Sequence, residues 1–314
     1  MKKKMKIVFF GTPEFAVASL DALVKNGADI AAVVTMPDKP AGRGHHMLQS
    51  DVKKYAVEHD IPVLQPRNLK DPEFISRLRD IGADLFIVIA FRMLPETVWA
   101  MPPKGTFNLH ASLLPRYRGA APINRAVMNG DTKTGVTTFF LKHEIDTGDI
   151  IDQQEIDILP EENVGDVHDK LMALGASMVV KTVADIEAGN ATCHPQPEGE
   201  YIPAPKIFKE DCRINWNRNA ADIHNHIRGL SPYPAAWTTV TDISGKTSDV
   251  KIFESRLTDE AVRDTSPGTV RIGKKELLVA ASDQWIEILS LQPQGKKRME
   301  TLAYLLGYKP AAFI

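Results

Sequence analysis

Two polar side chains, Asn108 and His110, stand two residues apart in the stretch FNLHASLLPRYRGAAPIN. On an extended strand, residues i and i+2 point to the same side, so both side chains can converge on one small group. An Asn amide donates hydrogen bonds, and a His ring donates a hydrogen bond or accepts a proton. Together they suit a carbonyl that becomes an oxyanion beside an attacking nucleophile. An Asn and a His that merely close a strand end would explain the pair equally well.

A carboxylate further along the chain favours the catalytic interpretation. Asp146 lies in the stretch HEIDTGDII, in a glycine-containing turn before an apolar run. A carboxylate beside a His orients the ring and makes it a better base. Asp is also favoured in turns for local reasons, and Asp149 of the same turn has only that explanation. We therefore expect Asp146 to complete a site with Asn108 and His110.

The elements that must position these side chains alternate along the first two-thirds of the chain. Short apolar runs alternate with helical patterns, which predicts an α/β fold with an open, mostly parallel, Rossmann-like sheet. The predicted strands are 6–10, 30–35, 62–65, 84–90 and 106–110, with a strand pair at 136–141 and 150–158. The predicted helices are 13–26, 50–59, 72–81, 123–129 and 164–188. Such sheets bind ligands at the carboxyl ends of their strands, where His110 is expected.

The first turn of this fold, FFGTPEF, argues against a dinucleotide site. Such a site needs Gly-x-Gly-x-x-Gly, so that the backbone can approach a pyrophosphate. Here only Gly11 is present, and Pro13 removes a backbone donor. We expect Gly11 to serve a close connection between the first strand and its helix.

The last third of the chain predicts a second domain. Prolines at 195, 197, 203 and 205 indicate a linker, and a helix is expected at 220–228. Short strands are predicted at 236–240, 250–255, 268–272, 276–280 and 285–291, which is typical of a small, OB-like β-barrel. The expected division is a catalytic domain over 1–190, a linker over 191–209 and a barrel domain over 210–314. Residues 206–314 carry 16 Lys and Arg against 13 Asp and Glu, a mild excess that suits a polyanion or simply a solvated surface.

The composition bounds the class of protein. The chain has 314 residues, a net charge of −2 and 43% hydrophobic residues, which is ordinary for a globular protein of two domains. The first apolar run is shorter than the ~7–15 residues of a signal peptide, and no stretch approaches the ~18–20 of a membrane span. Cys193 and Cys212 lack a paired spacing, and His224 and His226 are expected on different sides of a helix. We therefore expect no metal site, no membrane segment and a cytoplasmic location.

A long connection, Met36 to Gln49, follows the second predicted strand. Most connections of this kind span two to six residues, and longer ones are often functional. It contains Lys39 and Arg43, and Arg43 stands between two glycines, which suits an arginine that reaches a phosphate. A disordered insertion is the alternative explanation.

Five motifs occur in one order: GTPEFA, DKPAGRG, NLHASLLPRYRGAAPI, DTGD and PAPKI. In this the chain resembles the methionyl-tRNA formyltransferases over essentially its whole length. The Asn-x-His-x-Ser-Leu-Leu-Pro element is shared by the wider class of 10-formyltetrahydrofolate hydrolases and formyltransferases, whereas the DKPAGRG loop and the C-terminal domain narrow the resemblance. It implies transfer of a formyl group from 10-formyltetrahydrofolate to the α-amino group of methionyl initiator tRNA, by a monomer that uses no metal.

The resemblance also implies roles for individual residues. Asn108, His110 and Asp146 match the catalytic residues of the family. The segment that contacts the formyl folate matches Ser112, Leu113, Leu114 and Pro115, and its pterin pocket matches, more loosely, Phe91, Arg92, Met93 and Leu94. Contacts with tRNA are implied for Arg43, Lys39 and Lys206.

Two departures from the family pattern and one open question remain. His45, His46 and Met47 replace the usual basic pair after Gly-Arg-Gly, so the charge of this loop depends on pH near ~6.5. Glu144 and Ile145 precede Asp146, where Gly-Leu is common. Arg116 and Arg118 have no assigned role. The alternative functions are a sugar-nucleotide or purine-pathway formyltransferase, a formyl-folate hydrolase, and a tRNA-binding protein without catalysis.

Overall fold

The computed structural model describes residues 4–41, 46–199 and 201–314, which form two compact units. The first unit comprises Met1–Gly119, Gly135–Ile156 and Asp169–Pro203. The second comprises Ala120–Thr134, Asp157–His168 and Ala204–Ile314. Two segments that precede the linker therefore belong to the C-terminal unit, and the units interleave along the chain. The division at 190 and 209 stays a prediction about the functional domains.

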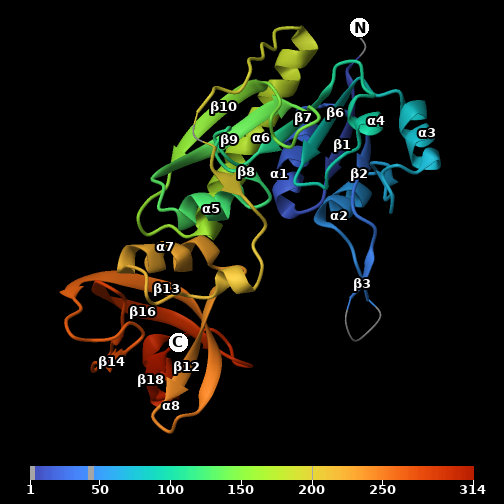
Figure 1. The fold of residues 1–314 in the computed structure, drawn as a ribbon. Helices are drawn as coiled ribbons and strands as arrows, with labels where there is room; N and C mark the ends of the chain where they lie inside the picture. The colour runs from blue at the N-terminus through green and yellow to red at the C-terminus, as the bar shows by residue number, and fades with distance from the viewer. Residues whose placement is uncertain (1–3, 42–45, 200) are drawn as a thin grey trace. The chain divides into compact units, whose positions relative to one another are not determined.

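The first unit is built on one sheet with the strand order β10–β9–β7–β6–β1–β2–β5 (Figure 1). Its strands are β1 (Lys6–Gly11), β2 (Asp29–Val34), β5 (Val63–Leu64), β6 (Leu85–Ile89), β7 (Thr106–His110), β9 (Lys133–Phe140) and β10 (Ile150–Asp157). The pairs from β5 to β7 are parallel, and β9 runs antiparallel to β7. The predicted open, mostly parallel sheet is confirmed.

Helices connect the strands, and one of them lies in the segment Ala120–Thr134 of the second unit. They are α1 (Glu14–Lys25), α2 (Asp51–Glu58), α3 (Pro72–Ile81), α4 (Glu96–Trp99), α5 (Pro122–Met128) and α6 (Val164–Ala188). Phe74 of α3 and Val98 of α4 pack in one hydrophobic core with Phe10 and Val88 of the sheet. Side chains of α2 and α3 cap their first turns: Ser50 Oγ accepts from the Lys53 amide at 3.1 Å. None of the helices described, α6 with 25 residues included, is long and apolar enough to cross a bilayer.

The connection from β1 to α1 is close-packed, as the sequence predicts. A Cβ atom on Gly11 would lie 2.7 Å from the Ala16 Cβ and 3.2 Å from the Ile89 carbonyl oxygen. No residue with a side chain fits between the strand end and the helix at this distance. Gly11 therefore serves packing.

The long connection after β2 contains a short hairpin. Its strands are β3 (Lys39–Ala41) and β4 (His46–Leu48), which pair antiparallel. The alternative explanation of this connection, a disordered insertion, is therefore wrong for these two segments. Arg43 and His45 lie outside the described residues.

The second unit contains an antiparallel sheet with the order β14–β15–β16–β13–β12–β18, and β17 pairs with β16. Its elements are α7 (Ala220–Leu230), β12 (Ala236–Asp242), β13 (Thr247–Ala261), β14 (Val270–Ile272), β15 (Leu277–Ala280), β16 (Gln284–Pro293), β17 (Met299–Glu300), α8 (Thr301–Gly307) and β18 (Pro310–Phe313). A bridge between Thr269 and Ala312 brings the two ends of the sheet together. The predicted small barrel is confirmed, but its closure uses β18, which the sequence did not predict.

Helix α7 carries one buried and one half-buried histidine, which predicts acid sensitivity. His226 is 9% exposed and its Nε2 atom has no hydrogen-bond partner, while His224 Nδ1 lies 3.0 Å from the Ser255 hydroxyl. Burial lowers the pKa of both rings below the usual value of 6.5. The unfolded chain therefore takes up protons first as pH falls, so stability is complete above about pH 6.5 and is lost below it.

We expect the free energy of unfolding, measured by urea titration, to decrease from pH 7.5 to pH 5.5, by up to ~1.4 kcal/mol per pH unit for each histidine. Replacing His226 by Phe removes its titration and should flatten this dependence. Ile223→Val in the same helix serves as the control, because it changes a buried side chain without removing a titrating group and should leave the pH dependence unchanged. An equally steep pH dependence in His226→Phe would contradict the assignment.

Candidate active site

Asn108 and His110 share one face of β7, as their spacing predicts. Asn108 is paired in register with Val88 of β6, which belongs to the core beneath α3 and α4. Leu109, between them, faces the opposite side, where α6 approaches so closely that a Cβ on Gly175 would meet its Cδ2 at 2.7 Å. His110 is 7% exposed at the end of the strand, and Asn108 is half-buried with no hydrogen-bond partner for its amide in the described chain. The Asn108 amide is thus available to a ligand.

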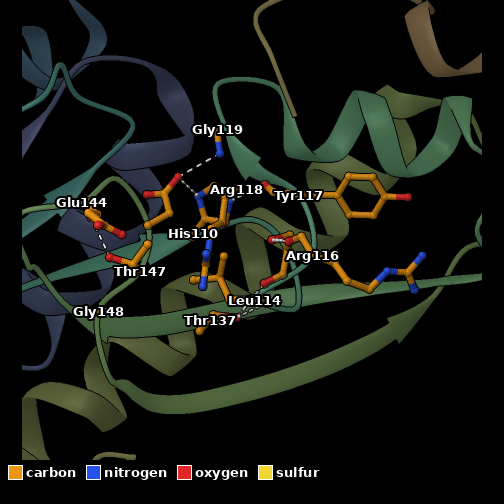
Figure 2. Close-up of polar contacts among 12 residues, drawn as sticks. His110, Leu114, Arg116, Tyr117, Arg118, Gly119, Thr137, Glu144, Thr147 and Gly148 are labelled. Atoms are coloured by element: carbon orange, nitrogen blue, oxygen red, sulfur yellow. Dashed lines mark hydrogen bonds and ion pairs between the residues drawn. The ribbon is translucent and has the colours of Figure 1, made fainter. Parts of the chain in front are cut away.

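A backbone carbonyl determines the protonation of the His110 ring. The His110 Nε2 atom lies 2.8 Å from the carbonyl oxygen of Tyr117, seven residues further along the chain (Figure 2). Because a carbonyl only accepts hydrogen bonds, Nε2 carries a proton, and in the neutral ring Nδ1 holds the free lone pair. Nδ1 faces the Asp146 carboxylate across 3.9 Å, which is too long for a hydrogen bond.

The structure therefore confirms that the His110 ring and the Asp146 carboxylate lie close together. The carboxylate was expected to orient the ring, but at this distance it is the Tyr117 carbonyl, bound to Nε2, that sets the tautomer of His110. The 3.9 Å gap leaves two acceptors facing each other when the ring is neutral. A proton donor, either a substrate N–H or a water molecule, can bridge them.

The turn that carries Asp146 is held by local geometry. Asp146 has a left-handed φ of +55°, which Asp tolerates better than most residues, and its Oδ2 atom accepts a hydrogen bond from the Gly119 amide at 2.9 Å. Two residues on, a Cβ at Gly148 would lie 1.6 Å from the Phe140 carbonyl oxygen, so only glycine lets the turn return to β9. The side chains of Glu144 and Ile145 are exposed. Glu144 and Ile145, which stand where Gly-Leu is common in the family, therefore lie at the surface of the turn.

The Gln196 side chain, which the sequence did not indicate, holds this turn through hydrogen bonds. Gln196 Nε2 donates to the carbonyl oxygens of Asp146, at 2.7 Å, and Gly148, at 2.9 Å. Its Oε1 atom accepts from Arg118, at 3.1 Å from Nε and 2.6 Å from a terminal guanidinium nitrogen. Arg118 thereby acquires a role, since it holds Gln196 against the Asp146 turn. Gln196 lies 50 residues from Asp146, in a proline-rich segment with no periodic pattern, and no sequence signal indicates it.

The segment predicted to contact a folate divides into buried and accessible side chains. Ser112 is fully buried and donates to the Arg116 carbonyl at 2.7 Å, and Leu114 packs with Phe139 and Ile150. Leu113 and Pro115 are half-buried and retain accessible surface. These two residues are the ones able to form the expected apolar wall.

Two further residues that the sequence did not single out hold this segment to the sheet. The Thr137 hydroxyl donates to the Ser112 carbonyl at 2.6 Å and accepts from the Leu114 amide at 3.2 Å. Gln153 donates to the Leu114 carbonyl at 2.8 Å. The remaining arginine of the motif, Arg116, lies over the Tyr117 ring at 5.5 Å. The backbone of the motif is thus rigidly positioned beside His110.

The segment expected to line a pterin pocket, Phe91 to Leu94, follows β6 after Ala90. The Phe91 ring contacts Phe10 edge-on at 5.8 Å, Leu94 is in the core, and the Met93 side chain is 72% exposed. Arg92 donates to the carbonyl oxygens of Pro66 and Arg67, and burial lowers the pKa of its guanidinium. With Phe91, Arg92 and Leu94 occupied in packing, a ligand at this strand end would meet main-chain groups and Met93.

The residues expected to contact tRNA lie in both units. Lys39 is exposed on β3, and Lys206 is exposed with its Nζ atom 5.4 Å from the Phe208 ring centroid. Arg43 lies outside the described residues. Among the residues that the structure describes, no group of three or more His, Cys, Asp and Glu could hold a metal ion.

Comparison with known proteins gives consistent matches over both parts of the chain. A family model described as formyl transferase matches residues 5–183, and the model of the formyl transferase C-terminal domain matches 206–309. A methionyl-tRNA formyltransferase of Bacteroides fragilis is 56% identical over 98% of this chain and 96% of its own length. One from Porphyromonas gingivalis is 47% identical over 98% and 97%.

A solved structure shares the fold. The sugar 3N-formyl transferase WlaRD, determined with dTDP and 5-N-formyl-THF, superposes with a TM-score of 0.68 at 21% identity. The match covers 94% of this chain and all of that one. At this identity the likeness concerns the fold alone.

Proposed function

The chain belongs to the formyl transferase family, and on that premise we propose that it transfers a formyl group from 10-formyltetrahydrofolate to the α-amino group of methionyl initiator tRNA. Two observations support the proposal. Relatives named methionyl-tRNA formyltransferase match nearly the whole chain at 47–56% identity. The observation that carries the chemistry is the His110–Asp146 pair at the end of β7, beside the free amide of Asn108.

The first step of the proposed reaction is attack by the neutral methionyl amine on the formyl carbon. A nitrogen–carbon bond forms, and the carbonyl oxygen becomes an oxyanion. The Asn108 amide donates to this oxygen, and its freedom from other partners leaves both N–H groups for the task. Because no protein group needs to move, the donor is in place before charge develops.

His110 and Asp146 handle the proton that the attacking amine must lose. Nδ1 of the neutral His110 ring is the available base, since Nε2 is bound to the Tyr117 carbonyl. Once protonated, the ring is held by two acceptors, that carbonyl and the Asp146 carboxylate, directly or through water. Collapse of the intermediate breaks the bond from the formyl carbon to folate N10, and N10 takes the proton. The result is formyl-methionyl-tRNA and tetrahydrofolate.

The remaining assignments extend the same proposal. Leu113 and Pro115 are assigned to the apolar side of the folate, and the main chain after β6 to its pterin ring. Arg43 and Lys39 are assigned to phosphates near the acceptor end of the tRNA. Because charged initiator tRNA is used in translation, the proposal places the enzyme in the cytoplasm. A monomeric state remains a prediction.

A direct comparison of acceptors tests the function. We expect formyl transfer from 10-formyltetrahydrofolate to methionyl initiator tRNA, and none to a UDP-amino sugar, glycinamide ribonucleotide or free methionine. The KM for the charged tRNA should rise with salt, because phosphate contacts release counterions. Equal use of free methionine, or preference for the amino sugar, would overturn the proposal.

Removal of Gln196 should slow this reaction through misplacement of Asp146. Gln196→Ala deletes both hydrogen bonds to the Asp146 turn, and we expect kcat to fall about ten- to hundred-fold, as when an outer partner of a functional side chain is lost. The KM for 10-formyltetrahydrofolate should change little. Gln196→Glu keeps the acceptor for Arg118 but loses the donor to the turn, so it should resemble Gln196→Ala. If Gln196→Glu restores full kcat, the donor is not what positions the turn.

A further inference from the structure

A groove in the C-terminal unit is lined by accessible aromatic rings. It forms a cavity of about 560 Å³, and its lining includes Phe208, Tyr233 and Trp237. Tyr233 is 81% exposed and Phe208 is 58% exposed, while Trp237 is half-buried. We call this feature the aromatic groove. Large aromatic side chains exposed together around a hollow indicate a binding surface.

Three cations beside the aromatic groove lie over aromatic rings. Lys206 Nζ lies 5.4 Å from the Phe208 ring centroid, and Lys209 Nζ and Arg213 Cζ each lie 5.5 Å from the Trp237 ring. Lys206 and Lys209 form no ion pair within the part of the chain that the structure describes, whereas a terminal nitrogen of Arg213 also lies 3.5 Å from an oxygen of Ile314. A ring attracts a cation without neutralising it, so these side chains keep their full charge while their positions are restricted.

Three other arginines of the barrel are paired with carboxylates, and two of them, Arg271 and Arg298, also lie over rings. The ion pairs there are Arg256–Glu287, Arg271–Glu260 and Arg298–Glu254. Each carboxylate cancels the charge of its arginine. Asp249, an acidic residue in the lining of the groove, accepts a hydrogen bond from the Thr239 hydroxyl at 3.0 Å. Lys206 and Lys209 therefore place positive charge without a carboxylate partner beside the aromatic groove, in a segment that also carries the acidic residues Glu210 and Asp211.

We propose that the aromatic groove binds an unpaired nucleotide of the RNA substrate. The base stacks on the exposed ring of Tyr233 or Phe208, and the flanking phosphates contact Lys206, Lys209 and Arg213. Every base has a flat apolar face, so aromatic rings bind single-stranded RNA with little regard to sequence. In a duplex these faces are covered by neighbouring bases, so the rings distinguish unpaired from paired RNA. The inference rests on the proposed function only in taking RNA as the substrate.

The test measures binding of two probes by the full chain, a labelled single-stranded hexaribonucleotide and a short, fully base-paired RNA duplex. Tyr233→Ala and Phe208→Ala should each weaken single-strand binding about ten-fold and change duplex binding less than two-fold. Lys209→Ala should weaken both probes and reduce the salt dependence of binding. Leu306→Ala is the matched control, because this side chain is 88% exposed in the same unit and lies outside the groove lining.

The outcomes separate the groove from the proposed reaction. Unchanged single-strand affinity in both aromatic variants, equal losses for the duplex, or no single-strand binding by the wild type at low salt would each overturn the groove assignment. Formyl transfer to charged tRNA is measured separately on the wild type. A wild type that transfers formyl groups while the aromatic variants bind normally refutes the groove alone. A wild type that binds the single strand through these rings but transfers no formyl group refutes the function alone.

Discussion

The Asn108→Ala variant should keep its fold and lose at least ~10²–10³-fold in kcat for formyl transfer. The Asn108 amide has no hydrogen-bond partner within the described chain, so its removal breaks no internal contact and should leave the melting temperature close to that of the wild type. Its donors act on an oxygen that becomes negative only as the amine attacks. The loss should therefore appear in kcat, with little change in KM for either substrate.

The matched control for this variant is Asn68→Ala. Asn68 is an exposed asparagine of the same unit, and its side chain accepts a hydrogen bond from the Lys70 amide at 3.0 Å. Single-turnover measurements on both variants separate chemistry from product release. A rate constant for Asn108→Ala within a few-fold of wild type would remove Asn108 from the catalytic assignment.

The second large effect is expected for Asp146→Asn, which should lower kcat by about 10²–10⁴-fold. The substitution preserves an oxygen that can accept from the Gly119 amide, now at 2.9 Å, so the turn should keep its conformation. It removes the negative charge that faces His110 Nδ1 across 3.9 Å. Without that charge the protonated ring is less stable, and transfer of the amine proton becomes slower.

Asp149 offers a control from the same turn. Its carboxylate pairs with Lys142 at 2.7 Å at the surface, an interaction of the kind that contributes little to stability. Asp149→Asn should therefore retain nearly full kcat. Equal losses in both variants would show that the turn needs charge in general, and would refute a specific role for Asp146.

The hydrogen bonds around Asp146 and His110 use three consecutive residues at the end of the motif, Tyr117 to Gly119. Tyr117 binds the His110 ring through its carbonyl, Gly119 binds the Asp146 carboxylate through its amide, and Arg118 binds Gln196. Tyr117, Arg118 and Gly119 thus hold the His110 ring, the Gln196 side chain and the Asp146 carboxylate in place. This explains why a strand that ends in a catalytic His is followed so closely by an ordered loop.

Much of the fold could be predicted because it depends on local patterns. The apolar runs of β1, β6 and β7 and the helical spacing of α3 and α6 indicate their own structure within a few residues. The positions of Asn108 and His110 on one face of β7 follow from the two-residue period of a strand. The barrel strand β18 was missed because four residues near the chain end carry too short a pattern, and only pairing with β12 makes them a strand.

The sequence by itself determined the sheet, the shared face of Asn108 and His110, and, through its ordered motifs, the family to which the site belongs. Only the tertiary structure decided that the Tyr117 carbonyl sets the His110 tautomer, that Asp146 stops at 3.9 Å from the ring, and that Gln196 fastens the turn. The physical reason is that these contacts join residues on different elements, in one case 50 positions apart. A hydrogen bond between distant segments imposes no periodicity on either, so it becomes visible only when the chain has folded.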